Sequence, residues 1–434
     1  MKIWLVTIGE PLPQATGRRD RLHRTGDFAH FLAERGHDVT WWTSAYDHFR
    51  KHFFGRDGEI LRLTPNLDVR LLKSSGYRVN LSVARLRDHH KLARLFARAV
   101  TGEVAPDLIV SALPTIELCR ESVRYARARA IPVVLDMRDM WPDIFVESVW
   151  TPVRSFVRLA IFPLLLQARE ACAGATAIIG ITEAFVDWGV VRAGRPRTRL
   201  DRAFPMGYNT FPPSPKEQAE AEEYWDNLGI LAKSEFTVCF LGTIGRQFEL
   251  EAVLEAARRL EASGRRMRFV LCGTGDRLEH YRARAAGLHS VLFPGWIGAA
   301  AIYVLMRRSS IGLDPLRERY DFLATINNKA IEYLSAGLPV ISSPDRGVLR
   351  DMLVERGCGA SVPSGNPEAL AGLIASLYDD PVRRVGMSRN AQQTFESTYQ
   401  AEVVYGEMLH HLEMVVAVQS KKKLPDEGSC QGGT

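Results

Sequence analysis

The sequence predicts an α/β protein with two doubly wound domains, each built around a parallel sheet. Short apolar runs, typical of strands buried on both faces, alternate with segments of helical period. This alternation stops at the proline-rich residues 211–215 and then restarts. A single hydrophobic core rarely exceeds roughly 250–300 residues, and the chain has 434. We therefore expect at least two cores.

The apolar runs and the turn residues between them define the expected elements. In the first half the strands are expected at 2–8, 38–43, 107–111, 132–136 and 177–181, with a helix at 18–35. In the second half the strands are expected at 236–241, 267–272, 289–293, 311–314 and 339–342, with helices at 250–263 and 329–336. The predicted domains are 1–210 and 211–395, followed by a C-terminal helix at 396–418 that could cross back to the first domain. The polar, glycine-rich tail at 419–434 is expected to be disordered.

Composition excludes several classes of protein. With 46% apolar and 24% charged residues, the chain is neither mainly disordered nor fibrous. It has no apolar run of the ~18 residues that a membrane-spanning helix needs. The six cysteines are widely spaced without a C-x-x-C pair, which argues against a disulfide framework or zinc knuckle and favours a reducing cytosol.

Charge is distributed unevenly along the chain. Residues 1–210 carry 31 Lys and Arg against 22 Asp and Glu, whereas residues 211–434 carry 25 against 28. The basic half could meet nucleic acid, phospholipid head groups or a pyrophosphate-linked substrate. A basic amphipathic helix is predicted at 80–100, and an apolar segment spans 150–168. Each of them could reach a membrane surface. Ordinary packing of both segments on the sheet, with a solvated basic edge, explains them equally well.

Two glycine-rich loops follow predicted strands of the second domain. Gly245 and Arg246 come after the strand at 236–241 and could approach a phosphate, although a plain turn with a surface arginine explains them equally well. Gly273 opens a Gly-x-Gly loop after the next strand. Alone, this pattern is weak evidence for a nucleotide-binding loop. One strand later, Trp296 and Ile297 could pair with and cover a base, although such a tryptophan is more often a core residue.

The strongest local pattern lies at the predicted helix 329–336. Asn327 or Asn328 can cap this helix, and its N-terminus together with Lys329 would form an anion site. Glu332 follows one turn later, where its carboxylate could accept both hydroxyls of a ribose. The alternative is an ordinary exposed Lys–Glu pair at i,i+3.

Taken together, these motifs resemble GT-B-fold glycosyltransferases of family 4. The pattern Asn328-Lys329-x-x-Glu332-Tyr333-x-x-x-Gly337-x-Pro339 resembles the nucleotide-sugar signature of that family. The segment 135–142, Leu-Asp-Met-Arg-Asp-Met-Trp-Pro, resembles one found in a subgroup that builds bacterial surface polysaccharides, including N-acetylfucosamine and colanic-acid transferases. Residues 16–18, before the first helix, resemble the first glycine-rich loop of the family, and residues 204–209 resemble the end of its first domain.

The resemblance implies two Rossmann-like domains facing across a cleft, the first binding the acceptor and the second the nucleotide sugar. It also implies transfer from a nucleoside diphosphate sugar with retention at the anomeric carbon. The expected donor is UDP-linked and could be an N-acetylhexosamine. The expected acceptor is lipid-linked or a surface polysaccharide. We expect a cytoplasmic enzyme that could associate with the inner face of the membrane and bind no nucleic acid.

The resemblance also implies roles for individual residues. Arg246 and Lys329 would neutralise the leaving diphosphate, Glu332 would hold the ribose, and Asp139 and Arg138 would contact sugar or acceptor. The implied donor-binding residues are Gly17, Arg18, Gly245, Gly273, Trp296, Ile297, Thr325, Asn328 and Glu332.

The sequence departs from the pattern of the family at two positions. Ala324 stands where the family often has a second glutamate, so backbone amides near Thr325 would have to bind the donor sugar instead. Arg138 stands where many members have a histidine. The alternative for Asp139 is a helix cap.

Because the sequence has no D-x-D triplet, we expect transfer without a metal and no cofactor. Other readings stay open: a sugar-nucleotide 2-epimerase of similar fold, or a non-catalytic nucleotide-sugar binder, which the alanine at 324 suggests.

Overall fold

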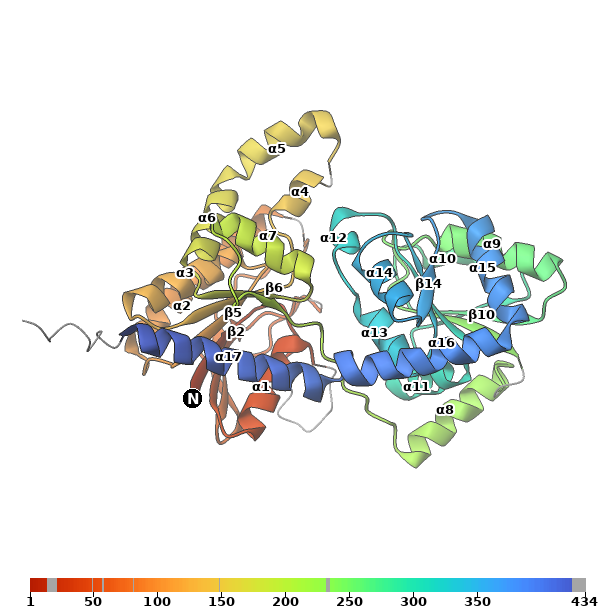
Figure 1. Cartoon of the computed structure of the whole chain (residues 1–434), viewed down its shortest axis with the longest axis horizontal. Coiled ribbons are helices and arrows are strands. Elements are labelled where there is room, and N and C mark those ends of the chain that lie inside the picture. Colours follow the sequence, from red (N-terminus) through yellow and green to blue (C-terminus); the bar gives the residue numbers. More distant parts are fainter. Residues whose placement is uncertain are drawn as a thin grey trace, which may run out of the picture. The chain divides into compact units, whose positions relative to one another are not determined.

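The computed structural model of the chain describes residues 1–13, 22–48, 50–56, 58–80, 82–147, 149–231 and 235–423. The chain forms two compact units (Figure 1). Unit 1 comprises Met1–Pro205 together with Val404–Thr434, and unit 2 comprises Met206–Val403. The boundary between the units therefore follows Pro205, whereas the sequence predicts it after residue 210.

Within the described residues, unit 1 contains an eight-stranded sheet in the order β3-β4-β2-β1-β5-β6-β7-β8. The strands are β1 (Lys2–Val6), β2 (Asp38–Ser44), β3 (Ile60–Thr64), β4 (Leu67–Leu72), β5 (Leu108–Ala112), β6 (Val133–Met137), β7 (Ala177–Gly180) and β8 (Arg202–Ala203). Only β3 pairs antiparallel, with β4, among the described pairings. The central strands β5, β6 and β7 are buried along their whole length, as apolar runs predict.

The helices of unit 1 include one from the far end of the chain. They are α1 (Arg24–Glu34), α2 (Val83–Ala99), α3 (Ile116–Ala128), α4 (Asp143–Glu147), α5 (Arg154–Ala160), α6 (Phe162–Gly174), α7 (Glu183–Ala193) and α17 (Ala401–Lys423), with short 3-10 turns η1 (Val100–Gly102) and η2 (Thr151–Val153). The ring of Tyr405 on α17 lies 5.5 Å from that of Phe28 and 5.8 Å from that of Phe31, so α17 packs on α1.

Two helix boundaries differ from the sequence prediction. The first helix begins at Arg24 rather than at residue 18, and residues 14–21 lie outside the described part of the chain. The last helix runs from Ala401 to Lys423, so the prediction of disorder from residue 419 is wrong for its first five residues. The helix continues through the valine-rich residues 415–418 into this lysine run, because lysine is itself a good helix former.

Unit 2 contains, among its described residues, a six-stranded parallel sheet in the order β11-β10-β9-β12-β13-β14. Its strands are β9 (Phe236–Leu241), β10 (Met267–Cys272), β11 (Val291–Gly295), β12 (Ile311–Pro315), β13 (Val340–Ser343) and β14 (Gly359–Ser361). Its helices are α8 (Pro215–Asn227), α9 (Leu250–Ala262), α10 (Leu278–Arg284), α11 (Ala299–Arg308), α12 (Tyr320–Leu323), α13 (Asn328–Ser335), α14 (Val348–Glu355), α15 (Pro367–Asp379) and α16 (Pro381–Thr394), with a π-helical turn η3 (Phe395–Tyr399). The sequence missed α8, which begins inside the proline-rich stretch with a Ser214–Glu217 capping box.

Both sheets have the strand order of a doubly wound dinucleotide-binding fold. In unit 2 the order reverses between β9 and β12, and in unit 1 it reverses between β1 and β5. The predicted fold class, two Rossmann-like α/β domains, is confirmed. Ligands of such folds bind at the carboxyl ends of the strands near the reversal. The loops after β9, β10 and β12 in unit 2, and those after β1 and β6 in unit 1, are therefore where a site is expected.

Candidate functional site

Two loops of unit 2 lie against each other at the carboxyl edge of its sheet. The amide of Gly242, after β9, donates to the carbonyl of Cys272 at 3.0 Å, and the amide of Ile244 donates to the carbonyl of Thr274 at 2.9 Å. A Cβ at Gly273 would lie 1.7 Å from the carbonyl oxygen of Gly242, and the φ of Gly273 is +139°. A side chain there cannot be accommodated without moving the backbone, so the glycine that the sequence singled out fixes the approach of the two loops.

Lys329 projects from α13 across the end of β9. A Cβ at Gly242 would lie 2.3 Å from Cε of Lys329, so the absence of a side chain at Gly242 makes room for the lysine. Nζ of Lys329 lies 4.2 Å from the ring centroid of Phe248, within the range of a cation–π interaction. The ammonium group is thereby positioned beside the loop that carries Gly245 and Arg246.

The N-terminus of α13 is capped and tied to the strand before it. Oδ1 of Asn327 accepts a hydrogen bond from the amide of Ala330 at 3.1 Å, and Nδ2 of Asn327 donates to Asp314 on β12. Asp314 is fully buried, and Oδ1 of Asp314 has no hydrogen-bond partner among the described residues. Burial raises the pKa of Asp314, although Lys329 and the Asn327 hydrogen bond oppose this rise. Of the two asparagines offered by the sequence, Asn327 is the cap, and Asn328 is exposed at the first helical position.

Glu332 is buried rather than part of an exposed surface pair. Its side chain is 6% exposed, and its Oε1 accepts a hydrogen bond from the hydroxyl of Tyr208 at 2.9 Å. The next residue, Tyr333, accepts a hydrogen bond at its hydroxyl oxygen from the amide of Leu241 at 2.9 Å, which joins α13 to the end of β9. The alternative of an ordinary exposed Lys–Glu pair is therefore wrong, because the helix turns this face toward the sheet.

The remaining predicted residues of unit 2 border the same edge. Arg246 is exposed, and α9 begins at Leu250, where the sequence predicts it, so four residues separate Gly245 from that helix. Trp296 is 76% exposed, which rules out the core reading, whereas Ile297 is buried. The amide of Thr325 makes a long hydrogen bond of 3.4 Å to the carbonyl of Phe322.

Unit 1 holds a buried ion network at the carboxyl ends of β1 and β6. Asp136, fully buried on β6, accepts hydrogen bonds from Nε of Arg24 at 2.9 Å and from Nε of Arg138 at 2.7 Å. Nη1 of Arg138 also donates to Glu10. The carboxylate of Glu10 in turn accepts the amide of Thr25 at 2.9 Å, at the start of α1. Burial would raise the pKa of Asp136, but the two arginines outweigh it and lower that pKa.

This network bears on the residues predicted for sugar or acceptor contacts. Nε of Arg138 donates a hydrogen bond to Asp136, and its Nη1 donates to Glu10 and Thr25. Arg138 therefore connects the loops after β1 and β6. Asp139 is half-buried and lies near Arg85, whose pKa burial lowers and whose neighbouring carboxylates, Asp139 among them, partly oppose that effect. The helix after Asp139 begins at Asp143, so a direct capping role for Asp139 has no support from α4. Gly17 and Arg18 lie outside the described residues.

Sequence reasoning missed the partners that position these side chains. Tyr208 lies 124 residues before Glu332, and Arg24 lies 112 residues before Asp136. One signal was present: an aspartate inside an apolar strand, as at 136, must find a cation when it is buried. Among the described residues, no group of three or more His, Cys, Asp or Glu is arranged to hold a metal ion.

A comparison with protein families matches residues 235–380 to the model described as "Glycosyl transferases group 1". The match spans all of the loops described above in unit 2. No curated protein matches the chain as a whole.

Solved structures match nearly the whole chain. Sucrose-phosphate synthase from Thermosynechococcus elongatus has 17% identity, a TM-score of 0.71, and coverage of 96% of this chain and 99% of its own. HepE from Anabaena, solved with UDP and glucose, has 15% identity, a TM-score of 0.63, and coverage of 95% and 100%. WaaG, a glycosyltransferase involved in lipopolysaccharide biosynthesis, has 13% identity, a TM-score of 0.61, and coverage of 96% and 99%.

These likenesses establish the fold as GT-B. A group 1 glycosyl transferase domain within that fold defines the class of protein: an enzyme that transfers a glycosyl group. The predicted fold and enzyme class are confirmed.

Proposed function

We propose that the chain is a retaining glycosyltransferase of family 4 that transfers a sugar from a UDP-linked donor to a lipid-linked or surface-polysaccharide acceptor. The proposed donor sugar is an N-acetylhexosamine, and the proposed setting is the inner face of the cytoplasmic membrane. Unit 2 binds the nucleotide sugar, and unit 1 binds the acceptor. The observation that carries this proposal is the position of Lys329, held across Gly242 beside the glycine-rich loops at the reversal of strand order.

The proposed chemistry follows from where charge develops. The bond from the anomeric carbon to the diphosphate breaks, a bond to the acceptor oxygen forms on the same face, and the acceptor proton passes to the leaving phosphate. Negative charge grows on the diphosphate in the transition state, so preorganised cations give the largest benefit. Lys329 and Arg246 supply this charge, and Glu332, oriented by Tyr208, accepts the ribose hydroxyls. That HepE was solved with UDP supports uracil as the base.

Uridine diphosphate is expected to raise the melting temperature of the protein in the presence of EDTA. The reason is that Lys329 and Arg246 supply cationic charge that a metal ion would otherwise provide. Thermal shifts and turnover with a panel of nucleoside diphosphate sugars, with and without polyprenyl-linked acceptors, test this. Loss of the shift on chelation contradicts metal independence, and turnover of donor without acceptor identifies an epimerase instead.

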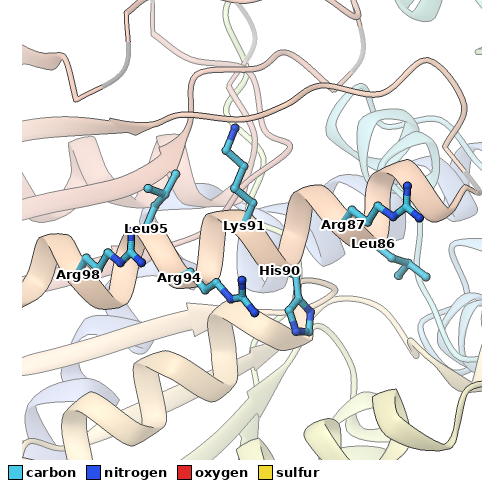
Figure 2. A pocket seen from close by; sticks show the side chains of 7 residues that line it. All are labelled: Leu86, Arg87, His90, Lys91, Arg94, Leu95 and Arg98. Atoms are coloured by element: carbon cyan, nitrogen blue, oxygen red, sulfur yellow. The ribbon is translucent and has the colours of Figure 1, made fainter.

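A surface groove supports the membrane part of the proposal. The groove, of about 600 Å³, lies along α2 (Figure 2). Its lining residues are Leu86, Arg87, His90, Lys91, Arg94, Leu95 and Arg98. Arg87, Arg94 and Arg98 line this groove, whereas Leu92 and Phe96, on the opposite face of α2, are fully buried. A basic rim with leucines between the cations suits anionic lipid head groups.

A second surface of unit 1 exposes large apolar side chains. Trp150, Phe156 and Leu159, on and around α5, are 76%, 75% and 73% exposed. Figure 1 shows α5 projecting from the rest of unit 1, joined to it through α6. The basic residues Arg154 and Arg158 lie on the same short helix. Apolar side chains flanked by arginine suit insertion at the edge of a bilayer. Within the described residues, no helix has the length and hydropathy needed to span one.

The protein is expected to bind vesicles with anionic lipids and to dissociate at high salt. Replacing Arg87, Arg94 and Arg98 together with glutamine should weaken binding roughly 100-fold, because each basic residue near the surface contributes about 1 kcal/mol. Sedimentation with vesicles measures this. A matched triple substitution of Arg258, Arg265 and Arg282 to glutamine in unit 2 removes the same charge and should bind normally. Equal binding to neutral and anionic vesicles would contradict the electrostatic part.

A further inference from the structure

A second group of cations gathers in unit 1 at the carboxyl ends of β2 and β4. Nζ of Lys51 lies 4.8 Å from the ring centroid of Tyr77, and Cζ of Arg85 lies 5.7 Å from the same centroid. Nδ1 of His48 is 2.6 Å from the hydroxyl oxygen of Tyr77. Three nitrogen-bearing side chains, two from the loop after β2 and one from α2, therefore converge on one tyrosine.

The scaffold around this cluster holds the cations in place. Tyr46 and Phe53 form a bridge that closes the loop carrying His48 and Lys51. Lys51 has φ of +58°, a left-handed conformation uncommon for a residue other than glycine and often found at binding sites. Cζ of Arg85 also lies 4.4 Å from the ring centroid of Trp141. Arg85 thus lies against two aromatic rings, and among the described residues its Nη2 is left available for an anion.

Nζ of Lys51 donates to Oδ1 of Asn80, and Arg85 uses some but not all of its donors. Nε of Arg85 donates to His89 at 3.3 Å and Nη1 to the carbonyl of Asn80 at 3.0 Å, whereas no described residue accepts from Nη2. Burial and the mutual repulsion of the two cations lower the pKa of Lys51. Burial, Arg85 and Lys51 lower the pKa of His48 to about 4. A bound anion would relieve this repulsion.

Carboxylates also face the cluster, but several have other partners. Asp47 accepts the amide of Arg50 at 2.8 Å, and Asp88 accepts the hydroxyl of Ser74 at 2.7 Å. Asp139 and Glu117 lie near Arg85 and raise its pKa, although burial has the larger, opposite effect. The guanidinium and ammonium groups are therefore only partly compensated from within unit 1.

We propose that Lys51, Arg85, His48 and Tyr77 form a binding site for a phosphoryl group. If unit 1 binds the acceptor, as proposed above, this group is a phosphate of the acceptor, held at the carboxyl edge of the sheet. An arginine fork, a lysine and a tyrosine hydroxyl together match the several oxygens and double charge of a phosphate ester better than a single carboxylate.

Competitive amine labelling of the full chain tests the site. The protein is saturated with UDP so that the donor loops of unit 2 are occupied, and inorganic phosphate replaces chloride at constant ionic strength. The labelling rate of Lys51 should fall by the factor one plus the ratio of phosphate concentration to Kd, which is about tenfold at about nine times Kd. Lys216, whose side chain is 86% exposed, should label at an unchanged rate. Equal labelling of Lys51 in phosphate and chloride overturns the proposal.

Variants separate the site from nonspecific charge. Arg85→Gln should remove most of the protection, whereas Arg62→Gln, at an exposed arginine paired with Asp68, should keep it. Because Arg85 is packed between rings and its loss could unfold the unit, Lys51→Gln provides a second test. Broadening of the phosphate resonance in ³¹P spectra should disappear in that variant. Protection of Lys51 that persists in Arg85→Gln, or broadening that persists in Lys51→Gln, overturns the assignment.

Two phosphate esters distinguish the source of the group. Protection by glucose 1-phosphate identifies a soluble ester, protection confined to dodecyl phosphate identifies a lipid phosphate, and protection by neither overturns the site. Labelling requires no sugar transfer, so the two proposals fail separately. Transfer without protection leaves the proposed function standing and removes this inference, whereas protection without transfer does the reverse.

Discussion

Replacing Lys329 with alanine is expected to lower kcat by about 2–4 kcal/mol of transition-state stabilisation, roughly 30- to 1000-fold, as when one preorganised donor is removed. The ammonium group lies against Gly242 and over the ring of Phe248, so it is positioned before the donor binds. Its attraction to the diphosphate grows as the sugar–phosphate bond breaks. The expected effect is therefore on kcat more than on donor KM, measured by steady-state kinetics with saturating acceptor.

Glu332→Gln serves as the matched comparison on the same helix. The ribose does not change charge during transfer, so the contribution of Glu332 is uniform binding, and its loss should raise donor KM more than it lowers kcat. Tyr208→Phe removes the hydroxyl that donates to Glu332 and should produce a weaker change of the same kind. An exposed i,i+3 pair would contribute only about 0.5 kcal/mol. Wild-type kinetics in correctly folded Lys329→Ala and Glu332→Gln proteins, checked by circular dichroism, would remove this site assignment.

The buried parallel strands were the most predictable part of the fold. The ranges 236–241 and 267–272, predicted from apolar runs, coincide with β9 and β10, because strands buried on both faces are largely apolar. The search for apolar runs did not predict β4, because the first four residues of Leu67–Leu72 alternate between buried and half-buried positions. β3, its antiparallel neighbour at the edge, is half-exposed throughout and has even less apolar signal.

The candidate site could be predicted where its residues lie close together in sequence. Lys329 and Glu332 share one helix, so their spacing alone places them one turn apart. Tyr208 and Asp314 join them only through the order of strands in unit 2, which a sequence pattern does not specify. The same holds for the cluster around Tyr77. His48 and Lys51 follow β2, Tyr77 follows β4, and Arg85 lies on α2. Contacts of this kind depend on topology rather than on local periodicity.

The role of Arg138 illustrates a different limit. A resemblance places this arginine where a family has a site residue, and it says nothing about the partners that neighbouring strands supply. In this chain Asp136, two residues earlier, and Glu10, after β1, both accept hydrogen bonds from the guanidinium. Burial lowers the pKa of Arg138, but these carboxylates outweigh that effect and raise it, so its charge is retained in the fold. A contact to acceptor would have to use the remaining donors of the same group.

Asp136→Ala is expected to destabilise unit 1 by about 3–5 kcal/mol, because removing one partner of a buried ion pair leaves an uncompensated charge. Arg24 is 1% exposed and would lose the carboxylate that its Nε contacts at 2.9 Å. Among the described residues, Arg138 would keep only Glu10 as an ionic partner. Urea unfolding followed by near-ultraviolet circular dichroism measures the effect. Asp68→Ala, which breaks an exposed pair with Arg62 in the same unit, should cost no more than about 1 kcal/mol.

The pH dependence of the same variant separates the charge from the packing. The pKa of Asp136 is lower in the folded protein than in the unfolded chain, because Arg138 and Arg24 outweigh the opposing effect of burial. The stability contributed by this carboxylate is therefore fully present above its unfolded pKa of about 3.9 and is lost as the pH falls toward the folded value. The difference in unfolding free energy between wild type and Asp136→Ala should accordingly be constant near neutral pH and shrink below about pH 4. A difference that stays constant down to pH 2 would mean that the carboxylate acts through packing alone. UDP binding in unit 2 should persist in the variant at neutral pH, since the network lies wholly within unit 1.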